Sequence, residues 1–151
     1  MQLDLMFNKF EIEQLDSKNI TFYLFFFFHS SMYTLKTIPE DFIVEEVSTF
    51  EIEDGPFSYY KLTKKERNTE GVVIDIVNNN NIKRKNIGYA GAKDKHAKTT
   101  QFISCKGSLK TGSFDSYSLE KVGTGKQPIS LGDLKENRFT ITVRNLKNNK
   151  E

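Results

Sequence analysis

The chain of 151 residues carries 22 lysines and arginines against 20 aspartates and glutamates, so its formal net charge is only +2. This length suits one domain with a hydrophobic core, and the 37% of hydrophobic residues exclude a wholly disordered chain. One cysteine and two histidines exclude an internal disulfide and the usual zinc ligand sets, so we expect a reduced, cytoplasmic protein without a metal.

Residues 1–31 differ in composition from the rest of the chain and include a run of phenylalanines at 25–28. The apolar run at 20–28 is far shorter than the roughly 20 residues of a membrane-spanning helix, so we expect no membrane association. Acidic residues precede it where a signal peptide needs positive charge. A regular pattern begins at Met32, and we interpret residues 1–31 as a poorly ordered leader or gene-model extension. An extra edge strand at 20–28 is the alternative.

From Met32 the pattern consists of short extended segments separated by turn residues. We predict strands at residues 42–47, 58–62, 87–90, 100–105, 117–122 and 139–143. Asn68 can cap a helix over the β-branched residues 71–77, although their composition also suits a strand. The sum is an α+β domain over residues 32–147, with a mainly antiparallel sheet and one or two helices, followed by a polar tail at 148–151.

Positive charge is concentrated in residues 83–110, where eight lysines and arginines face one acidic residue, Asp94, for a local charge of +7. Such a field attracts a phosphate backbone. An ordinary solvated surface is the alternative interpretation of a basic cluster. Tyr89, His96 and Phe102 lie among the lysines and favour nucleic acid, because planar side chains can stack on unpaired bases.

Residues 91–101 read G-A-K-D-K-H-A-K-T-T-Q and place Asp94 directly between Lys93 and Lys95. Nearby opposite charges favour the ionised form of a carboxyl group, so we expect Asp94 to be a carboxylate near neutral pH, able to act as a base or nucleophile. A single aspartate in a glycine-bounded loop can also be a turn residue whose side chain bonds its own backbone. The spacing alone does not decide between the two.

Four segments, in chain order, resemble motifs of the TruD family of tRNA pseudouridine synthases. Residues 91–101 resemble its G-x-K-D-[KR]-x-A-x-T-x-Q loop, which carries the family's catalytic aspartate. Residues 35–46 resemble its K-x-x-P-E-D-F-x-V-x-E strand, and residues 61–69 its L-x-K-x-x-x-N-T segment. Residues 131–144 resemble its L-G-x-L-x-G-N-x-F strand, with Glu136 where a glycine is common. The resemblance implies the N-terminal part of a pseudouridine synthase catalytic domain.

The resemblance also implies roles for the residues that match single motif positions. Asp94 matches the catalytic aspartate, and Lys36 matches a lysine near it that could act as its counter-ion. Phe42 and Phe139 match aromatics that line the pocket and stack on the target base, and Asn137 matches a pocket asparagine. Core packing of the two phenylalanines and a surface position for Lys36 are the alternatives.

Lys93, Lys95 and His96 complete the candidate substrate-binding residues, because the lysines of this region can meet RNA phosphates. Phosphate contacts position an RNA without choosing the uridine. The implied reaction converts uridine, at position 13 in the D-arm region of tRNA, into pseudouridine, and it needs no cofactor or metal. Asp94 would act as a nucleophile or abstract a ribose proton, and the sequence leaves both routes open.

Family members usually continue into an N-Y-F-G-x-Q-R-F-G segment and an inserted domain, whereas this sequence stops at Glu151. We interpret it as a truncated product, a partial sequence, or one half of a split enzyme whose other part is a separate chain. Weak or no activity is then expected of the chain alone. A non-catalytic RNA-binding module is the alternative function, and a degraded gene product with no role is the third.

Overall fold

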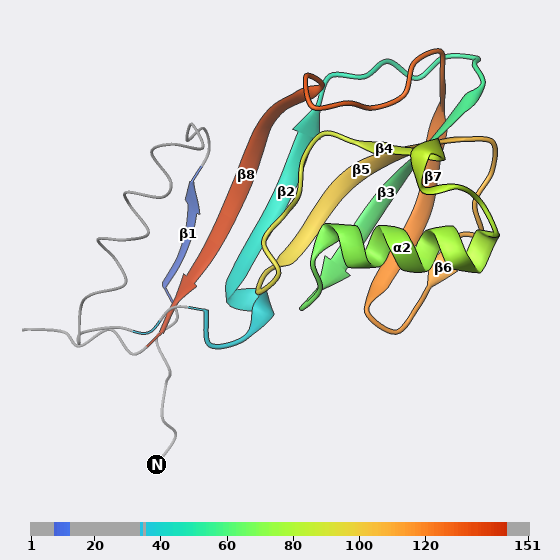
Figure 1. Cartoon of the computed structure of the whole chain (residues 1–151). Helices are drawn as coiled ribbons and strands as arrows, with labels where there is room; N and C mark the ends of the chain where they lie inside the picture. Colours follow the sequence, from blue (N-terminus) through green and yellow to red (C-terminus); the bar gives the residue numbers. More distant parts are fainter. Residues whose placement is uncertain (1–7, 13–33, 35, 145–151) are drawn as a thin grey trace, which may run out of the picture.

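The structure is a computed structural model that describes residues 8–12, 34 and 36–144. Within these residues one helix lies across one face of a single sheet (Figure 1). The helical elements are the 3-10 turn η1, Pro39–Asp41, the α-helix α2, Thr69–Asn80, and the 3-10 turn η2, Arg84–Asn86. The strands are β1, Asn8–Ile12; β2, Phe42–Ser48; β3, Phe57–Lys65; β4, Ile87–Tyr89; β5, Lys98–Lys106; β6, Gly112–Ser113; β7, Tyr117–Gly125; and β8, Leu134–Val143.

The strands follow the spatial order β1-β8-β2-β5-β3-β7-β6, and β4 pairs with the second half of β5. Every pair is antiparallel except β2 and β5, which run parallel. The parallel pair places Ile43 opposite Lys98, so the beginning of β2 lies beside the end of the loop that precedes β5. The predicted α+β class with a mainly antiparallel sheet is confirmed.

Helix α2 forms because its first turn is capped and one of its faces is apolar. The side chain of Asn68 accepts a hydrogen bond from the backbone N–H of Gly71 at 2.6 Å, which satisfies one of the unpaired donors of the first turn. Val72, Val73 and Ile76 are buried against the sheet. The helix, and not the alternative strand, is therefore what residues 71–77 form.

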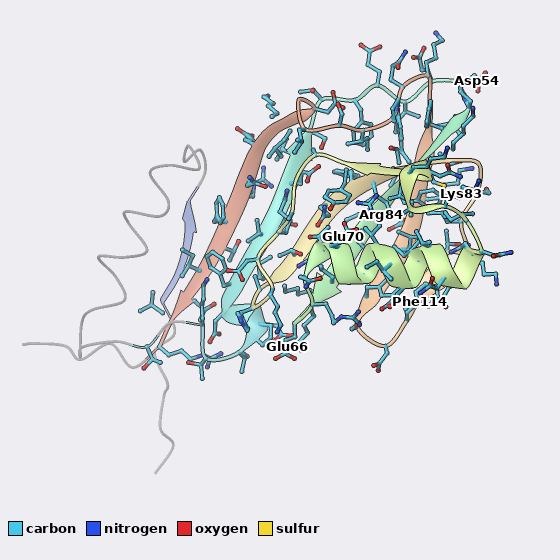
Figure 2. All side chains as sticks on the ribbon, viewed as in Figure 1. Asp54, Glu66, Glu70, Lys83, Arg84 and Phe114 are labelled. Atoms are coloured by element: carbon cyan, nitrogen blue, oxygen red, sulfur yellow. The ribbon has the colours of Figure 1, made fainter. Side chains whose placement is uncertain are left out.

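The start of α2 is also tied to the segment that leads into β4. Arg84, labelled with Glu70 in Figure 2, donates two hydrogen bonds to the carboxylate of Glu70, at 2.7 and 2.8 Å. The Tyr89 hydroxyl donates a third at 2.8 Å. The hydrogen bonds from Arg84 and then Tyr89 lower the pKa of Glu70 to about 2. The chain is thus held in place just before residues 91–97, the segment that carries Asp94.

All six predicted strands are present, and several are longer than predicted. β3 runs to Lys65 and β8 begins at Leu134, because pairing with neighbouring strands continues beyond the residues of strongest strand propensity. The short strands β1 and β6 were not predicted. β1 lies inside residues 1–31, so that part of the presumed leader pairs with β8; the domain division itself stays a prediction.

Three features lie outside the described residues: the alternative strand at 20–28, Met32, where the regular pattern begins, and the tail at 148–151. Within the part of the chain that the structure describes, no helix is long and apolar enough to cross a membrane.

Candidate active site

Asp94 lies in the loop of residues 91–97, called here the Asp94 loop, between β4 and β5. Oδ2 of Asp94 accepts a hydrogen bond from the Lys36 ammonium at 2.9 Å, and Oδ1 accepts one from the backbone N–H of His96 at 2.8 Å. The side chain of Asp94 keeps 35% of its surface exposed. The carboxylate is therefore fixed in direction while one side of it remains accessible to solvent.

The two hydrogen bonds decide the charge state of Asp94. Partial burial raises the pKa of its carboxyl group, but the hydrogen bonds from Lys36 and His96, together with the charge of Lys36, outweigh burial and leave the pKa below its ordinary value. The expectation of an ionised Asp94 near neutral pH agrees with this direction. The hydrogen bond from His96 is also the one expected of a turn residue, because the Asp94 side chain accepts from the backbone N–H two residues further along the chain.

Lys36 reaches Asp94 from the segment before β2. Its backbone φ of +52° is in the left-handed region, which residues other than glycine seldom adopt. Its ammonium lies 3.9 Å from the centroid of the Phe42 ring. The backbone N–H groups of Thr37 and Ile38 both donate to Oδ2 of Asp41, at 3.1 and 3.2 Å, which fixes the turn that follows Lys36. The expected contact of Lys36 with Asp94 is present, whereas its role stays a proposal.

Phe42 of β2 and Phe139 of β8 lie on the same sheet face, with ring centroids 6.0 Å apart and planes inclined at 36°. Both are buried, and they pack into a small cluster with Val44 and with Ala97, the last residue of the Asp94 loop. Both rings are buried in this chain, which fits the alternative of core packing, and their contact with a base stays a proposal.

Asn137 lies opposite Glu46 in the pairing of β8 with β2, on the face that carries the two phenylalanines. Its Oδ1 is buried and has no hydrogen-bond partner among the described residues. A buried acceptor of this kind is costly unless a donor reaches it. The asparagine is thus half-buried beside the aromatic cluster with one acceptor available.

The structure corrects the expected place of Lys93. Its side chain is not beside the Asp94 carboxylate and does not face solvent: its ammonium lies 2.8 Å from Oε2 of Glu46, with side-chain exposures of 5% and 0%. The contact is an ion pair outside hydrogen-bonding geometry. A buried, paired lysine is not placed for phosphate contact, because pairing and burial withdraw its charge from the surface. Lys95 and His96, in contrast, are exposed.

Three polar residues that shape the Asp94 loop were missed by the sequence analysis. Lys64, only 1% exposed, donates to the backbone carbonyls of Asp94 at 2.8 Å and Lys93 at 3.3 Å. Thr69 accepts from the backbone N–H of Lys93 at 3.0 Å and donates to Gln101 at 2.9 Å.

Gln101 in turn donates to the carbonyl of Gly91 at 3.2 Å. Lys64, Thr69 and Gln101 all lie within the segments that resemble family motifs. The signal that could have identified Lys64 is its position in the strand. It follows Tyr60 and Leu62 at intervals of two residues and so lies on the same buried face of β3. Among the residues described, no cluster of three or more histidine, cysteine or acidic side chains could hold a metal ion.

The model of the family "tRNA pseudouridine synthase D (TruD)" matches residues 23–151. A protein of Methanocaldococcus jannaschii named probable tRNA pseudouridine synthase D 2 is 43% identical over 143 residues, covering 86% of this chain and 34% of the relative. The tRNA pseudouridine synthase D of Leptospira interrogans is 35% identical over 119 residues, covering 76% of this chain and 29% of the relative.

A crystal structure of the putative tRNA pseudouridine synthase D of Methanosarcina mazei aligns with a TM-score of 0.70 and 34% sequence identity, covering 77% of this chain and 28% of that one. The α+β fold of this chain therefore corresponds to part of a TruD-type structure. The chain belongs to the TruD family. It spans about a third of the length of the relatives it matches.

Proposed function

We propose that this chain provides the aspartate-bearing part of a tRNA pseudouridine synthase, and that Asp94 is the catalytic carboxylate. The observation that carries the proposal is the arrangement of Asp94 itself. It has a lowered pKa, is partly exposed, and is held by Lys36, whose ammonium also lies over the ring of Phe42. The names of the relatives supply the substrate class, tRNA, and the reaction, isomerisation of uridine.

We assign each of these side chains a role in the reaction. Asp94, ionised and directed by two donors, attacks the ribose or removes a ribose proton when the bond between the sugar and uracil N1 breaks. Lys36 keeps the carboxylate charged. Phe42 and Phe139 hold the flipped base, while the amide of Asn137 bonds a polar edge of it. We take uridine 13 as the target.

Lys95 and His96 are exposed beside Asp94 and meet the phosphates that flank the flipped nucleotide. Extrusion of the nucleotide costs a few kcal/mol, which these contacts must supply together with base stacking. Because the chain spans about a third of its relatives, we infer that further parts of the binding site come from the portion of the relatives that this chain does not match. The cytoplasmic location expected from the single cysteine stays a prediction.

The test compares the 151-residue chain, and a fusion of it to the remaining part of the M. jannaschii relative, with their Asp94→Asn variants. Each protein is incubated with unmodified tRNA, and pseudouridine is mapped by mass spectrometry. We expect modification by the fusion at uridine 13, little by the chain alone, and none by either variant. An active Asp94→Asn fusion would reject the role of Asp94, and an inactive but folded wild-type fusion would reject the enzymatic proposal.

The limited span of the chain also favours a second candidate, a non-catalytic RNA-binding part of a larger enzyme. Binding of tRNA by the isolated chain without turnover, alongside a fusion that stays active with Asp94→Asn, is the outcome that this candidate predicts. Modification by the chain alone excludes it.

A further inference from the structure

Lys64 is a buried lysine whose ammonium is directed at backbone and not at a carboxylate. It lies on the apolar face of β3, in line with Tyr60 and Leu62, and is 1% exposed. Burial of an ammonium costs several kcal/mol unless its hydrogen bonds are made inside the protein. Lys64 makes two, to the carbonyl oxygens of Lys93 and Asp94.

These two carbonyls have a particular relation to Asp94. The carbonyl of Lys93 belongs to the peptide group before the α-carbon of Asp94, and the carbonyl of Asp94 belongs to the peptide group after it. One side chain therefore holds both peptide groups whose rotation sets the direction of the Asp94 side chain. Thr69 and Gln101 hold the preceding residues of the loop and contact neither of these carbonyls.

We propose that Lys64 is a positioning residue, which fixes the direction of the Asp94 carboxylate by binding the two carbonyls on either side of it. The inference rests on the proposed function, since it names a residue that prepares the same site. Lys64 acts only through backbone and lies under the loop, so it does not touch substrate. The ammonium is needed because two carbonyls that turn inward would otherwise be buried without donors.

The charge of Lys64 gives the contact a pH dependence. Burial, which outweighs the attraction of Asp94 and is reinforced by the charge of Lys93, lowers the pKa of Lys64 to about 8. Asp94 and Lys93 are the charged groups that act on it; its register neighbours are Thr99 on β5 and Tyr117 on β7. A neutral amine is a weaker donor than an ammonium, so the loop is held less firmly above this pH.

The first test uses the 151-residue chain without RNA. Amide hydrogen exchange of His96, whose N–H bonds the Asp94 carboxylate, is measured in wild type, Lys64→Met and Lys61→Met. Lys61 is an exposed lysine on the same strand and serves as the matched control. We expect exchange about tenfold faster in Lys64→Met, as for loss of one hydrogen bond from a charged donor, and no change in Lys61→Met. Unchanged exchange in a folded Lys64→Met would overturn the proposal.

The second test needs no variant and decides the matter if Lys64→Met does not fold. Exchange of the His96 amide in the wild-type chain, corrected for the intrinsic chemical rate, is followed from about pH 6.5 to about pH 9.5. We expect it to accelerate as the pH passes about 8. A flat profile contradicts a positioning role for the ammonium.

In the fusion described above, Lys64→Met should lower kcat about tenfold and leave KM for tRNA unchanged, because substrate contacts remain. Failure of the proposed function would show as an inactive wild-type fusion and would not alter the exchange results. Normal kcat in Lys64→Met, with normal His96 exchange, would reject the inference alone.

Discussion

Asp41 and Arg144 stand 103 residues apart in the chain and form a bidentate ion pair, with both hydrogen bonds at 2.7 Å. The carboxylate of Asp41 is buried, and it also accepts the two N–H groups of the turn that follows Lys36. One carboxylate thus joins the C-terminal end of β8 to the segment that brings Lys36 to Asp94. The position of Lys36 at the candidate site therefore depends on this junction.

Asp41→Asn should destabilise the chain and make its free energy of unfolding less dependent on pH in the acidic range. The hydrogen bonds from Arg144, which outweigh burial, lower the pKa of Asp41 below its ordinary 3.8. The stabilisation is therefore complete above the pKa of the unfolded state and is lost as pH falls through the lower pKa of the folded state. Thermal unfolding should show a melting temperature lower by several degrees at pH 7, with the difference from wild type shrinking in acid.

Glu40→Gln is the matched control, because Glu40 is the neighbouring residue and pairs with Lys65 at the surface. Exposed pairs contribute little to stability. An equal loss of stability in Glu40→Gln and Asp41→Asn would contradict the importance assigned to the buried pair.

Glu46→Gln should be strongly destabilising, because it leaves the buried ammonium of Lys93 without its counter-charge. Removal of one partner of a buried ion pair typically costs about 3–5 kcal/mol, whereas replacement of both by apolar residues is often nearly neutral. Urea unfolding should therefore show a large loss in Glu46→Gln that is mostly recovered in the double variant with Glu46→Leu and Lys93→Met.

The exposed pair of Glu53 and Lys126 provides the comparison for this experiment. Glu53→Gln should leave the unfolding midpoint unchanged. If the double variant is no more stable than Glu46→Gln, the penalty comes from lost packing and not from an unpaired charge.

Local sequence patterns were enough to predict the central strands and the helix, because alternation, the Asn68 cap and turn residues are local signals. The pairing of β2 with β5, which brings Ala97 at the end of the Asp94 loop against Phe42 and Phe139, depends on contacts between distant segments. No local pattern carries that information. The short strand β6 was missed for the same reason, since its two residues are defined only by pairing with β7.

The family motifs assigned roles to Asp94 and Lys36. Residues whose side chains bond the backbone of the loop, such as Lys64 and Thr69, were missed. Lys93 and Lys95 are adjacent to Asp94 in sequence, yet the contact comes from Lys36, 58 residues away. Charge counting treated every lysine as exposed, because lysine is rarely buried unless paired. Lys64 and Lys93 are nevertheless buried, because Lys64 donates to the backbone of the loop and Lys93 pairs with Glu46.

Lys36→Met should raise the pKa of Asp94. The hydrogen bond and charge of Lys36 are lost, while the burial that raises this pKa remains. The titration of the Asp94 carboxyl carbon, followed by NMR from about pH 2 to about pH 7, should shift upward relative to wild type. Lys95→Met is the control and should leave the titration in place, because Lys95 does not contact the carboxylate. An equal shift in both variants would show that lysines next to Asp94 in sequence contribute to its lowered pKa as much as Lys36 does.

Asn68→Ala should cost about 1 kcal/mol of unfolding free energy, because the Gly71 N–H loses its acceptor at the start of α2. Asn78→Ala, an exposed substitution in the last turn of the same helix, should have a neutral or slightly stabilising effect, since alanine has the higher helix propensity. Urea unfolding of both variants measures the difference. A loss in Asn78→Ala as large as that in Asn68→Ala would show that the cap is not the source.

Lys95→Gln should weaken tRNA binding and make it less dependent on salt, because Lys95 is exposed beside Asp94 in the proposed RNA-binding region. Each phosphate contact contributes about 0.7–0.9 to the slope of log affinity against log salt concentration, so the slope should fall by about that amount. Lys61→Gln, on the opposite face of the sheet from Lys64, should leave the slope unchanged. Titrations of labelled tRNA at several salt concentrations provide the slopes. An unchanged slope in Lys95→Gln would remove Lys95 from the phosphate contacts, and equal decreases in both variants would show that binding depends on overall charge alone.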